Sequence, residues 1–238
     1  MDDAGKRYAL YFAPDPASDL WRFGSACLGY DACTGAACTA LAVQGFAPDV
    51  WSALTEEPRR YGFHATLKAP FHLAVDASEA QVIAALEAFA ASHGAFTLPR
   101  LRIALLSRFV ALVPAVPSAA LQDLAARAVE ALEPLRAPLS AADVERRLRA
   151  PLSETQKAHV QRWGYPYVFE EFRFHMTLTG ALDAPLQARV LAELSALYRA
   201  NVSDDSLRID SVALFCQERR DAPFKIIRRA PLRAQRPA

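Results

Sequence analysis

Two short segments of this chain have nearly the same sequence, and they constrain its fold more than any other feature. Phe63-His-Ala-Thr-Leu67 and Phe174-His-Met-Thr-Leu178 share the pattern Phe-His-x-Thr-Leu. In a β-strand, successive side chains point to opposite faces, so the His and the Thr of each segment share one face. The other three side chains then face the core. Each predicted strand thus presents an imidazole beside a hydroxyl.

A single copy of this pattern would be weak evidence for function, because a His and a Thr on a strand are commonly a structural pair. The second copy changes the balance, since the two segments hold two of the five histidines in the chain. We therefore interpret His64 with Thr66, and His175 with Thr177, as the catalytic residues of one site.

The elements around the two segments recur in the same order. Residues 7–106 and 108–215 each predict a strand, a helix, the His-containing strand, a second helix and a final strand. Less regular stretches at 29–60 and 133–171 are interpreted as insertions, and the tail 231–238 is expected to be flexible. The order of elements indicates an internal duplication.

A duplicated unit of this kind predicts an α+β fold and a single bilobal domain over residues 1–238. The two lobes are expected to be related by a pseudo-twofold axis, each with an antiparallel or mixed sheet covered by helices. The two His-containing strands would then face each other across a central groove. The alternative is one mixed sheet without a groove.

Charge and hydropathy exclude some classes of partner. With 27 Lys and Arg against 26 Asp and Glu, the chain lacks the positive field that nucleic-acid binding normally requires. No run approaches the roughly 18 apolar residues of a membrane helix. The N-terminal residues 1–7 lack the apolar core of a signal peptide. We expect a cytoplasmic protein with a small phosphorylated partner, and the sequence leaves its oligomeric state open.

The sequence predicts neither a metal site nor a cofactor. The four cysteines form no Cys-x-x-Cys pair, and none has a His at metal-ligand spacing; they are Cys27, Cys33, Cys38 and Cys216. We expect them to be reduced packing residues. Phosphate-binding loops of the Gly-x-x-x-x-Gly-Lys-Ser/Thr type, Gly-x-Ser-x-Gly elbows and His-Glu-x-x-His helices are absent from the sequence.

Two imidazoles that face one groove suit a displacement at phosphorus. With an ordinary pKa of about 6.5, one imidazole can accept a proton from the attacking oxygen while the other donates a proton to the leaving oxygen. The hydroxyls of Thr66 and Thr177 can donate hydrogen bonds to the non-bridging phosphoryl oxygens. This chemistry requires no metal.

Residues that flank the two segments are candidates for substrate binding; they are Arg60, Tyr61, Lys68, Arg162, Trp163 and Tyr167. Lys68 is assigned to the opposite face of a regular strand, so we expect it to reach the groove only through a bulge. The aromatic stretch 161–169 either stacks on or closes over a substrate, or makes contacts in the core. The sequence does not choose between these roles.

The paired His-x-Thr-Leu segments within duplicated halves resemble the two-histidine (2H) phosphoesterase superfamily. The longer stretches Arg60–Phe71, Trp163–Tyr167 and Glu171–Gly180 resemble its branch of phosphonate-metabolism proteins encoded with carbon–phosphorus lyase genes. The resemblance covers nearly the whole chain. It implies a metal-independent phosphodiesterase with the two His-x-Thr pairs as catalytic residues. It also suggests a small cyclic ribose phosphate, such as a ribosyl 1,2-cyclic phosphate, as substrate.

Two other functions stay open at this point. One is an RNA 2′,3′-cyclic phosphodiesterase or end-processing enzyme, against which the near-neutral charge argues. The other is a non-catalytic protein that binds a phosphorylated sugar. The two complete His-x-Thr pairs argue against a pure binding protein, which would gain more from Arg or Lys than from titrating imidazoles.

Overall fold

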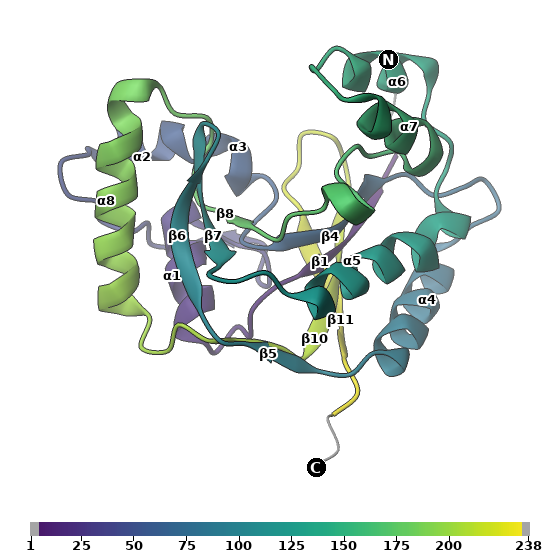
Figure 1. Cartoon of the computed structure of the whole chain (residues 1–238), viewed down its shortest axis with the longest axis horizontal. Coiled ribbons are helices and arrows are strands. Elements are labelled where there is room, and N and C mark those ends of the chain that lie inside the picture. Colours follow the sequence, from purple (N-terminus) through teal and green to yellow (C-terminus); the bar gives the residue numbers. More distant parts are fainter. Residues whose placement is uncertain (1–4, 235–238) are drawn as a thin grey trace.

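The structure, a computed structural model, describes residues 5–234 and is built on one seven-stranded antiparallel sheet. From edge to edge the order of its strands is β11-β10-β1-β4-β8-β7-β6 (Figure 1). These strands are β1 (Arg7–Phe12), β4 (Ala65–Phe71), β6 (Leu101–Leu106), β7 (Phe109–Pro114), β8 (Met176–Thr177), β10 (Ser211–Gln217) and β11 (Lys225–Pro231). Two small pairings join β2 (Tyr30–Asp31) to β3 (Ala36–Ala37) and β5 (Phe96–Leu98) to β9 (Leu207–Ile209).

The sequence repeats exchange a strand in this sheet. β6, from the first repeat, pairs with β7 of the second, and β10, from the second repeat, pairs with β1 of the first. Read outward from the centre, the order is β4-β1-β10 on one side and β8-β7-β6 on the other. A pseudo-twofold axis therefore relates the two sides of the sheet, and each side contains strands from both repeats.

The predicted α+β fold with a central groove is confirmed, but the two His-containing segments are arranged differently from the prediction. We expected them in two separate sheets that face each other. Instead β4 and β8 are neighbours in one sheet, with Ala65 paired to Met176. The second segment is also less regular than expected, since only Met176 and Thr177 have strand geometry.

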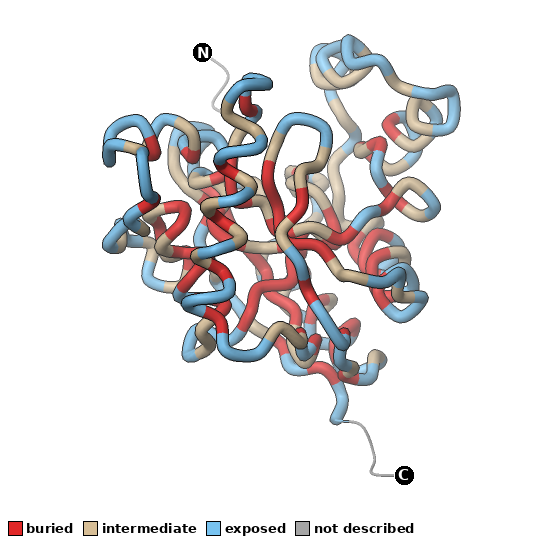
Figure 2. Tube along the Cα trace, turned by 60° about the vertical axis from the view of Figure 1, so that its left-hand side comes forward, coloured by how far each residue is buried: buried red, intermediate tan, exposed pale blue. Residues whose placement is uncertain are grey.

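Four helices cover the apolar side of the sheet; they are α1 (Asp19–Leu28), α4 (Glu79–Ser92), α5 (Ala119–Leu132) and α8 (Ala184–Asn201). α5 packs on β4, α8 on β6 and β7, and α4 on β10 and β11, while α1 packs on α8. Of these four, α1, α4 and α5 begin at a serine whose hydroxyl accepts a hydrogen bond from a backbone N–H in the first turn. The buried residues between helices and sheet form a continuous core (Figure 2).

Asp183 occupies the N-cap position of α8, but its side chain makes no capping hydrogen bond. Its carboxylate instead pairs with Arg108 at 3.0 Å. At the other end of the chain, the backbone carbonyl of Arg233 accepts a hydrogen bond of 2.8 Å from Ala95, which ties residues 231–234 to the fold. Residues 235–238 lie outside the described part, so the flexible tail stays a prediction there.

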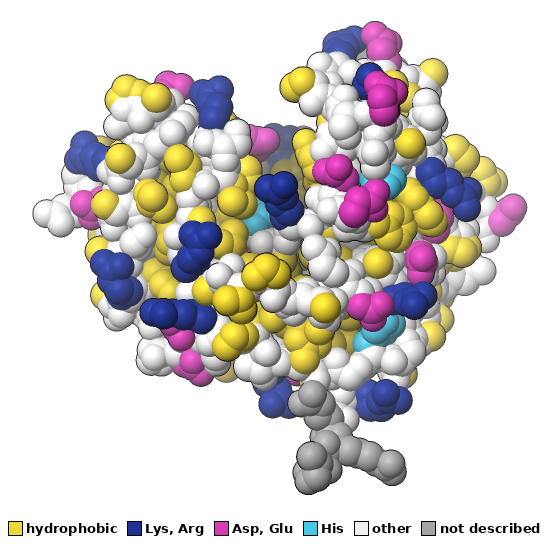
Figure 3. Space-filling model, viewed as in Figure 1, with side chains coloured by type: hydrophobic (Ala, Val, Ile, Leu, Met, Phe, Trp, Pro, Cys, Tyr) yellow, Lys and Arg dark blue, Asp and Glu magenta, His cyan; other side chains and the backbone are white. Residues whose placement is uncertain are grey.

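The two insertions rise on either side of the sheet. The first carries α2 (Pro48–Leu54) and α3 (Glu56–Arg59); the second carries α6 (Ala141–Leu148), α7 (Glu154–Trp163) and the short 3-10 helices η1 (Glu133–Leu135) and η2 (Phe169–Glu171). Figure 3 shows the molecule hollowed between the two sides. Among residues 5–234, none of the helices combines the length and the apolar character needed to span a bilayer.

Candidate active site

The two histidines occupy equivalent places in the sheet. His64 lies one residue before β4, and His175 lies one residue before β8. The antiparallel pairing of Ala65 with Met176 places each His across from the Thr of the other strand. Residues that face each other across two strands have Cβ atoms about 5 Å apart and share a face. The two His-x-Thr pairs therefore form one polar cluster on the sheet.

The alternation of faces predicted from the sequence is confirmed. The apolar residues of both segments are buried; they are Phe63, Ala65 and Leu67, and Phe174, Met176 and Leu178. The His and Thr residues are only half-buried. The apolar side of each segment thus anchors it to the core and holds the polar cluster toward solvent.

Both imidazoles are fixed by the same hydrogen bond. The Nδ1 atom of His64 lies 2.9 Å from the backbone carbonyl oxygen of Gly62, and that of His175 lies 2.7 Å from the carbonyl oxygen of Arg173. A carbonyl oxygen only accepts, so in each ring Nδ1 carries the hydrogen. The Nε2 atom of a neutral ring is then free to accept a proton. In His64, Nε2 lies 3.2 Å from the hydroxyl oxygen of Thr66.

Gly62 is required by the turn that delivers its carbonyl. Its φ angle is +72°, in the left-handed region that favours glycine. A Cβ atom at this position would lie 2.7 Å from the Cβ of Ala32. The glycine in the Tyr-Gly-Phe-His stretch therefore has a structural reason that is directly linked to the orientation of His64.

Loss of hydration lowers the pKa of both histidines, which favours their neutral forms. The ring of His64 stacks on Tyr11 with centroids 3.7 Å apart. Loss of hydration lowers the pKa of His64 to about 4, with the hydrogen bond to Gly62 opposing this shift and the charge of His175 adding to it. Burial also lowers the pKa of His175, and its bond to Arg173 opposes the shift. The effect of one His on the other places them within electrostatic reach.

The polar cluster opens into a groove with a volume of about 510 Å³. The floor of the groove is formed by Tyr11, His64, Thr66 and Thr177. Its walls come from the two insertions and the residues beside them, and include Glu57, Tyr61, Arg147 and Tyr165. His175 is not among these lining residues; its ring centroid lies 5.7 Å from that of Phe109, which lines the groove.

Lys68 points away from the groove, as expected, but for a different reason. In a regular strand, positions 64, 66 and 68 would share a face, so our assignment of Lys68 to the opposite face of a regular strand was wrong. The pairing of β4 with β1 shifts register between Thr66 and Lys68, which indicates a bulge at Leu67. The bulge turns Lys68 under the sheet, where its ammonium contacts Glu133 at 2.8 Å.

The other predicted substrate-binding residues are distributed over several places. Tyr61 lines the groove, and Trp163 lines a neighbouring cavity. Arg60 and Arg162 are exposed and line neither space, and the Arg162 guanidinium lies 5.0 Å from the Trp163 ring centroid. Tyr167 is 46% exposed and also lies outside both spaces.

Four groove residues were not singled out from the sequence. Arg7 and Tyr11 belong to β1, where alternation places them on one face, and this face proves to be the one toward the groove. Arg147 is a member of a basic cluster, and Tyr165 belongs to the aromatic stretch 161–169. Only the contact of β1 with β4 and the path of the second insertion bring these residues to the two histidines.

No group of His, Cys, Asp and Glu residues suited to a metal ion occurs within residues 5–234. The four cysteines are free thiols, with Cys27 and Cys216 buried and Cys33 and Cys38 half-buried. The groove is lined by imidazole, hydroxyl, aromatic and guanidinium groups, with the carboxylate of Glu57 on its wall.

A family model described as "Protein of unknown function (DUF1045)" matches residues 66–225. A relative from Janthinobacterium sp. (strain Marseille), named ribose 1,5-bisphosphate phosphokinase PhnN, is 38% identical over 232 residues, which are 96% of this chain and 51% of that protein. A relative of the same name from Laribacter hongkongensis (strain HLHK9) is 39% identical over 226 residues, 93% of this chain and 51% of that protein. The chain thus spans about half the length of these relatives.

Solved structures with a similar fold include E. coli LigT complexed with 3′-AMP, with a TM-score of 0.44 and 16% identity, covering 96% of this chain and 99% of that chain. Another is a phosphoesterase with a TM-score of 0.43 and 14% identity, covering the same shares of the two chains. Since both TM-scores are below 0.5, the chemistry of the site is argued from its own residues.

Proposed function

We propose that this chain, which belongs to the DUF1045 family, is a phosphodiesterase that hydrolyses a small cyclic phosphate with two histidines as base and acid. One observation carries the proposal: His64 and His175 are held by the same Nδ1 contact on adjacent strands, and His64, Thr66 and Thr177 line the groove. One imidazole can act as general base toward the attacking oxygen, and the other can act as general acid toward the leaving oxygen.

The reaction is a displacement by water at phosphorus. The oxygen of a water molecule forms a bond to phosphorus and gives its proton to the base. The bond from phosphorus to one ring oxygen breaks, and that oxygen takes a proton from the acid. The product is a phosphate monoester beside a free hydroxyl, and the two histidines have exchanged protonation states. The hydroxyls of Thr66 and Thr177 can hold the non-bridging oxygens while the bonds change.

We assign the base to His64. Its pKa of about 4 in the free protein makes it neutral over the physiological range, as a base must be. His175 is then the acid, and it requires a proton before the leaving oxygen departs. The negative charge of a bound phosphodiester stabilises an imidazolium, so substrate binding itself favours the protonated form of His175.

The substrate we favour is a cyclic phosphate of ribose, such as a 1,2-cyclic phosphate in phosphonate catabolism. Opening its ring at the 2-oxygen leaves ribose 1-phosphate. Two relatives that contain a matching half are named ribose 1,5-bisphosphate phosphokinase, which supports a sugar phosphate of this type. The kinase activity itself is not assigned to this half, because its sequence has no Gly-x-x-x-x-Gly-Lys-Ser/Thr loop.

The proposal is tested with His64→Asn and His175→Asn. An Asn amide can still donate to the carbonyl that Nδ1 contacts, so the fold should persist while proton transfer is lost. We expect kcat to fall by about 10²- to 10⁴-fold in each variant. His93→Asn is the matched control, because His93 lies at the end of α4 and lines neither cavity. Full turnover by either groove variant would overturn the proposal.

The substrate is identified by offering 1,2-, 2′,3′- and 3′,5′-cyclic phosphates and following the products by phosphorus NMR. The position of the new monoester then gives both the substrate class and the oxygen that leaves. Turnover should also survive excess chelator, because the proposed proton transfers involve no metal. Activity that is lost in EDTA and returns with a divalent metal would contradict the acid and base roles.

A further inference from the structure

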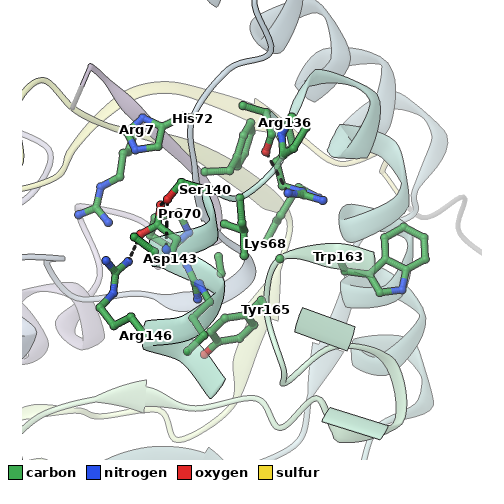
Figure 4. A pocket seen from close by; sticks show the side chains of 18 of the residues that line it. Arg7, Lys68, Pro70, His72, Arg136, Ser140, Asp143, Arg146, Trp163 and Tyr165 are labelled. Carbon is green, nitrogen blue, oxygen red and sulfur yellow. Dashed lines mark hydrogen bonds and ion pairs between the residues drawn. The ribbon is translucent and has the colours of Figure 1, made fainter. Parts of the chain in front are cut away.

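A second cavity adjoins the groove, beneath the second insertion. It has a volume of about 510 Å³ and lies between the end of β4 and helices α6 and α7. Figure 4 shows Arg7, Arg146 and Tyr165 around it. The cavity and the groove share five lining residues, which are Arg7, Ala69, Pro70, Arg147 and Tyr165. The two spaces are therefore neighbours with a common wall.

The second cavity is strongly cationic. The Lys and Arg residues that line it are Arg7, Lys68, Arg136, Arg146, Arg147 and Arg220, whereas Asp143 is its only acidic lining residue among residues 5–234. Three of these cations are neutralised by carboxylates. Lys68 and Arg136 both pair with Glu133, and Arg146 pairs with Asp143.

The other three cations, Arg7, Arg147 and Arg220, make no ion pair with a carboxylate of the described residues. Arg7 is held in place by a neutral partner, since its Nε donates to the side-chain oxygen of Gln217 at 2.7 Å. Because Gln217 is fully buried, it fixes the position of the Arg7 side chain. Because its amide is neutral, it leaves the positive charge of Arg7 uncompensated.

Among the residues that line the cavity, Arg147 most strongly favours an anionic ligand. Its Nε atom is buried and has no hydrogen-bond partner within residues 5–234. Burial lowers the pKa of the guanidinium, although an arginine stays charged at any physiological pH. The side chain as a whole is half-buried, and a buried polar atom without a hydrogen-bond partner is costly, so this guanidinium has a donor available for an anionic ligand. Arg147 also stands in the wall shared with the groove.

We propose that this cavity binds a second anionic group of the substrate, a phosphate monoester, while the cyclic phosphodiester lies at the two histidines. The inference rests on the proposed function and narrows it to cyclic phosphates that carry a second, terminal phosphate. A phosphate monoester carries a charge between −1 and −2 near neutral pH, which suits guanidinium groups that have no carboxylate partner. Because the groove and the second cavity share lining residues, one molecule of the size of a sugar phosphate can extend from the groove into the cavity.

The test uses one pair of substrates, a cyclic ribose phosphate with and without a phosphate on its 5-hydroxyl. The wild-type protein should prefer the 5-phosphorylated member in kcat/KM. Arg147→Met should lower kcat/KM for that member by about 10- to 100-fold, as loss of charge-assisted hydrogen bonds predicts, and should change the other member little. Arg149→Met is the control, because Arg149 ends the same helix but is exposed and pairs with Glu145.

Each outcome decides the matter. A loss confined to the 5-phosphorylated substrate supports the second phosphate site. An equal loss for both substrates would place Arg147 at the reacting phosphate or in the fold, and would overturn it. Absence of preference in the wild-type protein would do the same.

Failure of the proposed function is distinguishable by calorimetry. If no cyclic phosphate is turned over, binding of ribose 5-phosphate to the wild-type protein and to Arg147→Met is compared. Binding that depends on Arg147 keeps the site, and equal or undetectable binding removes it.

Discussion

Replacing His64 with Asn should make the protein less sensitive to acid. The pKa of His64 is about 4 in the folded chain, against an ordinary value of about 6.5 in an unfolded one. Between these two values the unfolded chain binds a proton that the folded chain does not. The free energy of unfolding therefore falls as the pH falls from 6.5 toward 4. Integrated from pH 7 to pH 5, this one group removes about 2 kcal/mol of stability.

The Asn variant isolates this effect because its amide does not titrate and can still donate to the carbonyl of Gly62. The contribution of His175 is present in both proteins and cancels in the comparison. Urea unfolding, followed by tryptophan fluorescence at pH 7 and pH 5, should give a loss of stability that is about 2 kcal/mol smaller in the variant. The urea dependence should be the same in both proteins.

An equal loss in the two proteins would refute the reasoning. It would mean that the imidazole of His64 is hydrated in the folded state, so that its stacking on Tyr11 does not exclude water. The assignment of His64 as the base would then lose its physical basis, even if the residue proved essential for turnover.

Three further predictions concern the pH dependence of turnover, the buried Lys68 and the packing of Gly24. The pH profile of kcat/KM should have its maximum below pH 6.5, because catalysis needs a neutral His64 and a protonated His175. Neutral His64 is lost below about pH 4, and protonated His175 is lost above its pKa, which burial lowers. A maximum above pH 7 would contradict this prediction. Lys68→Met should reduce the free energy of unfolding by about 2 kcal/mol, because it removes one partner of a buried ion pair, and an unchanged Tm would contradict this. Gly24→Ala should cost about 1–3 kcal/mol, since a Cβ would lie 2.2 Å from the ring of Phe63; a wild-type Tm would show that α1 can shift.

The local parts of the fold follow from the sequence because they depend on neighbouring residues. Alternation in Phe63–Leu67 and Phe174–Leu178 predicts which side chains are buried, and the structure confirms it. The capping box of α4, formed by Ser78 and Gln81, corresponds to a Ser-x-x-Gln pattern visible in the sequence. Such features are determined by hydrogen bonds and side-chain directions within a few positions, so the amino-acid sequence contains them directly.

The pairing of the sheet could not be read in the same way. The repeats exchange β6 and β10; β6 forms a hairpin with the neighbouring β7, but β10 pairs with β1 from the opposite end of the chain. The bulge at Leu67, which decides the direction of Lys68, depends on the register of β4 against β1. Local propensity does not determine register between distant strands, because every residue of a strand can form the same backbone hydrogen bonds.

In the candidate site, some residues could be identified from the sequence, whereas others are brought there only by tertiary contacts. The sequence by itself determined the two His-x-Thr pairs, because a repeated motif is visible without any knowledge of contacts. Only the tertiary structure decided that Arg7 and Arg147 stand in the wall between the groove and the second cavity, since they come from the first strand and the second insertion. An arginine in a sequence gives no sign of whether a carboxylate will lie beside it. That depends on packing, and among residues 5–234 neither Arg7 nor Arg147 pairs with a carboxylate.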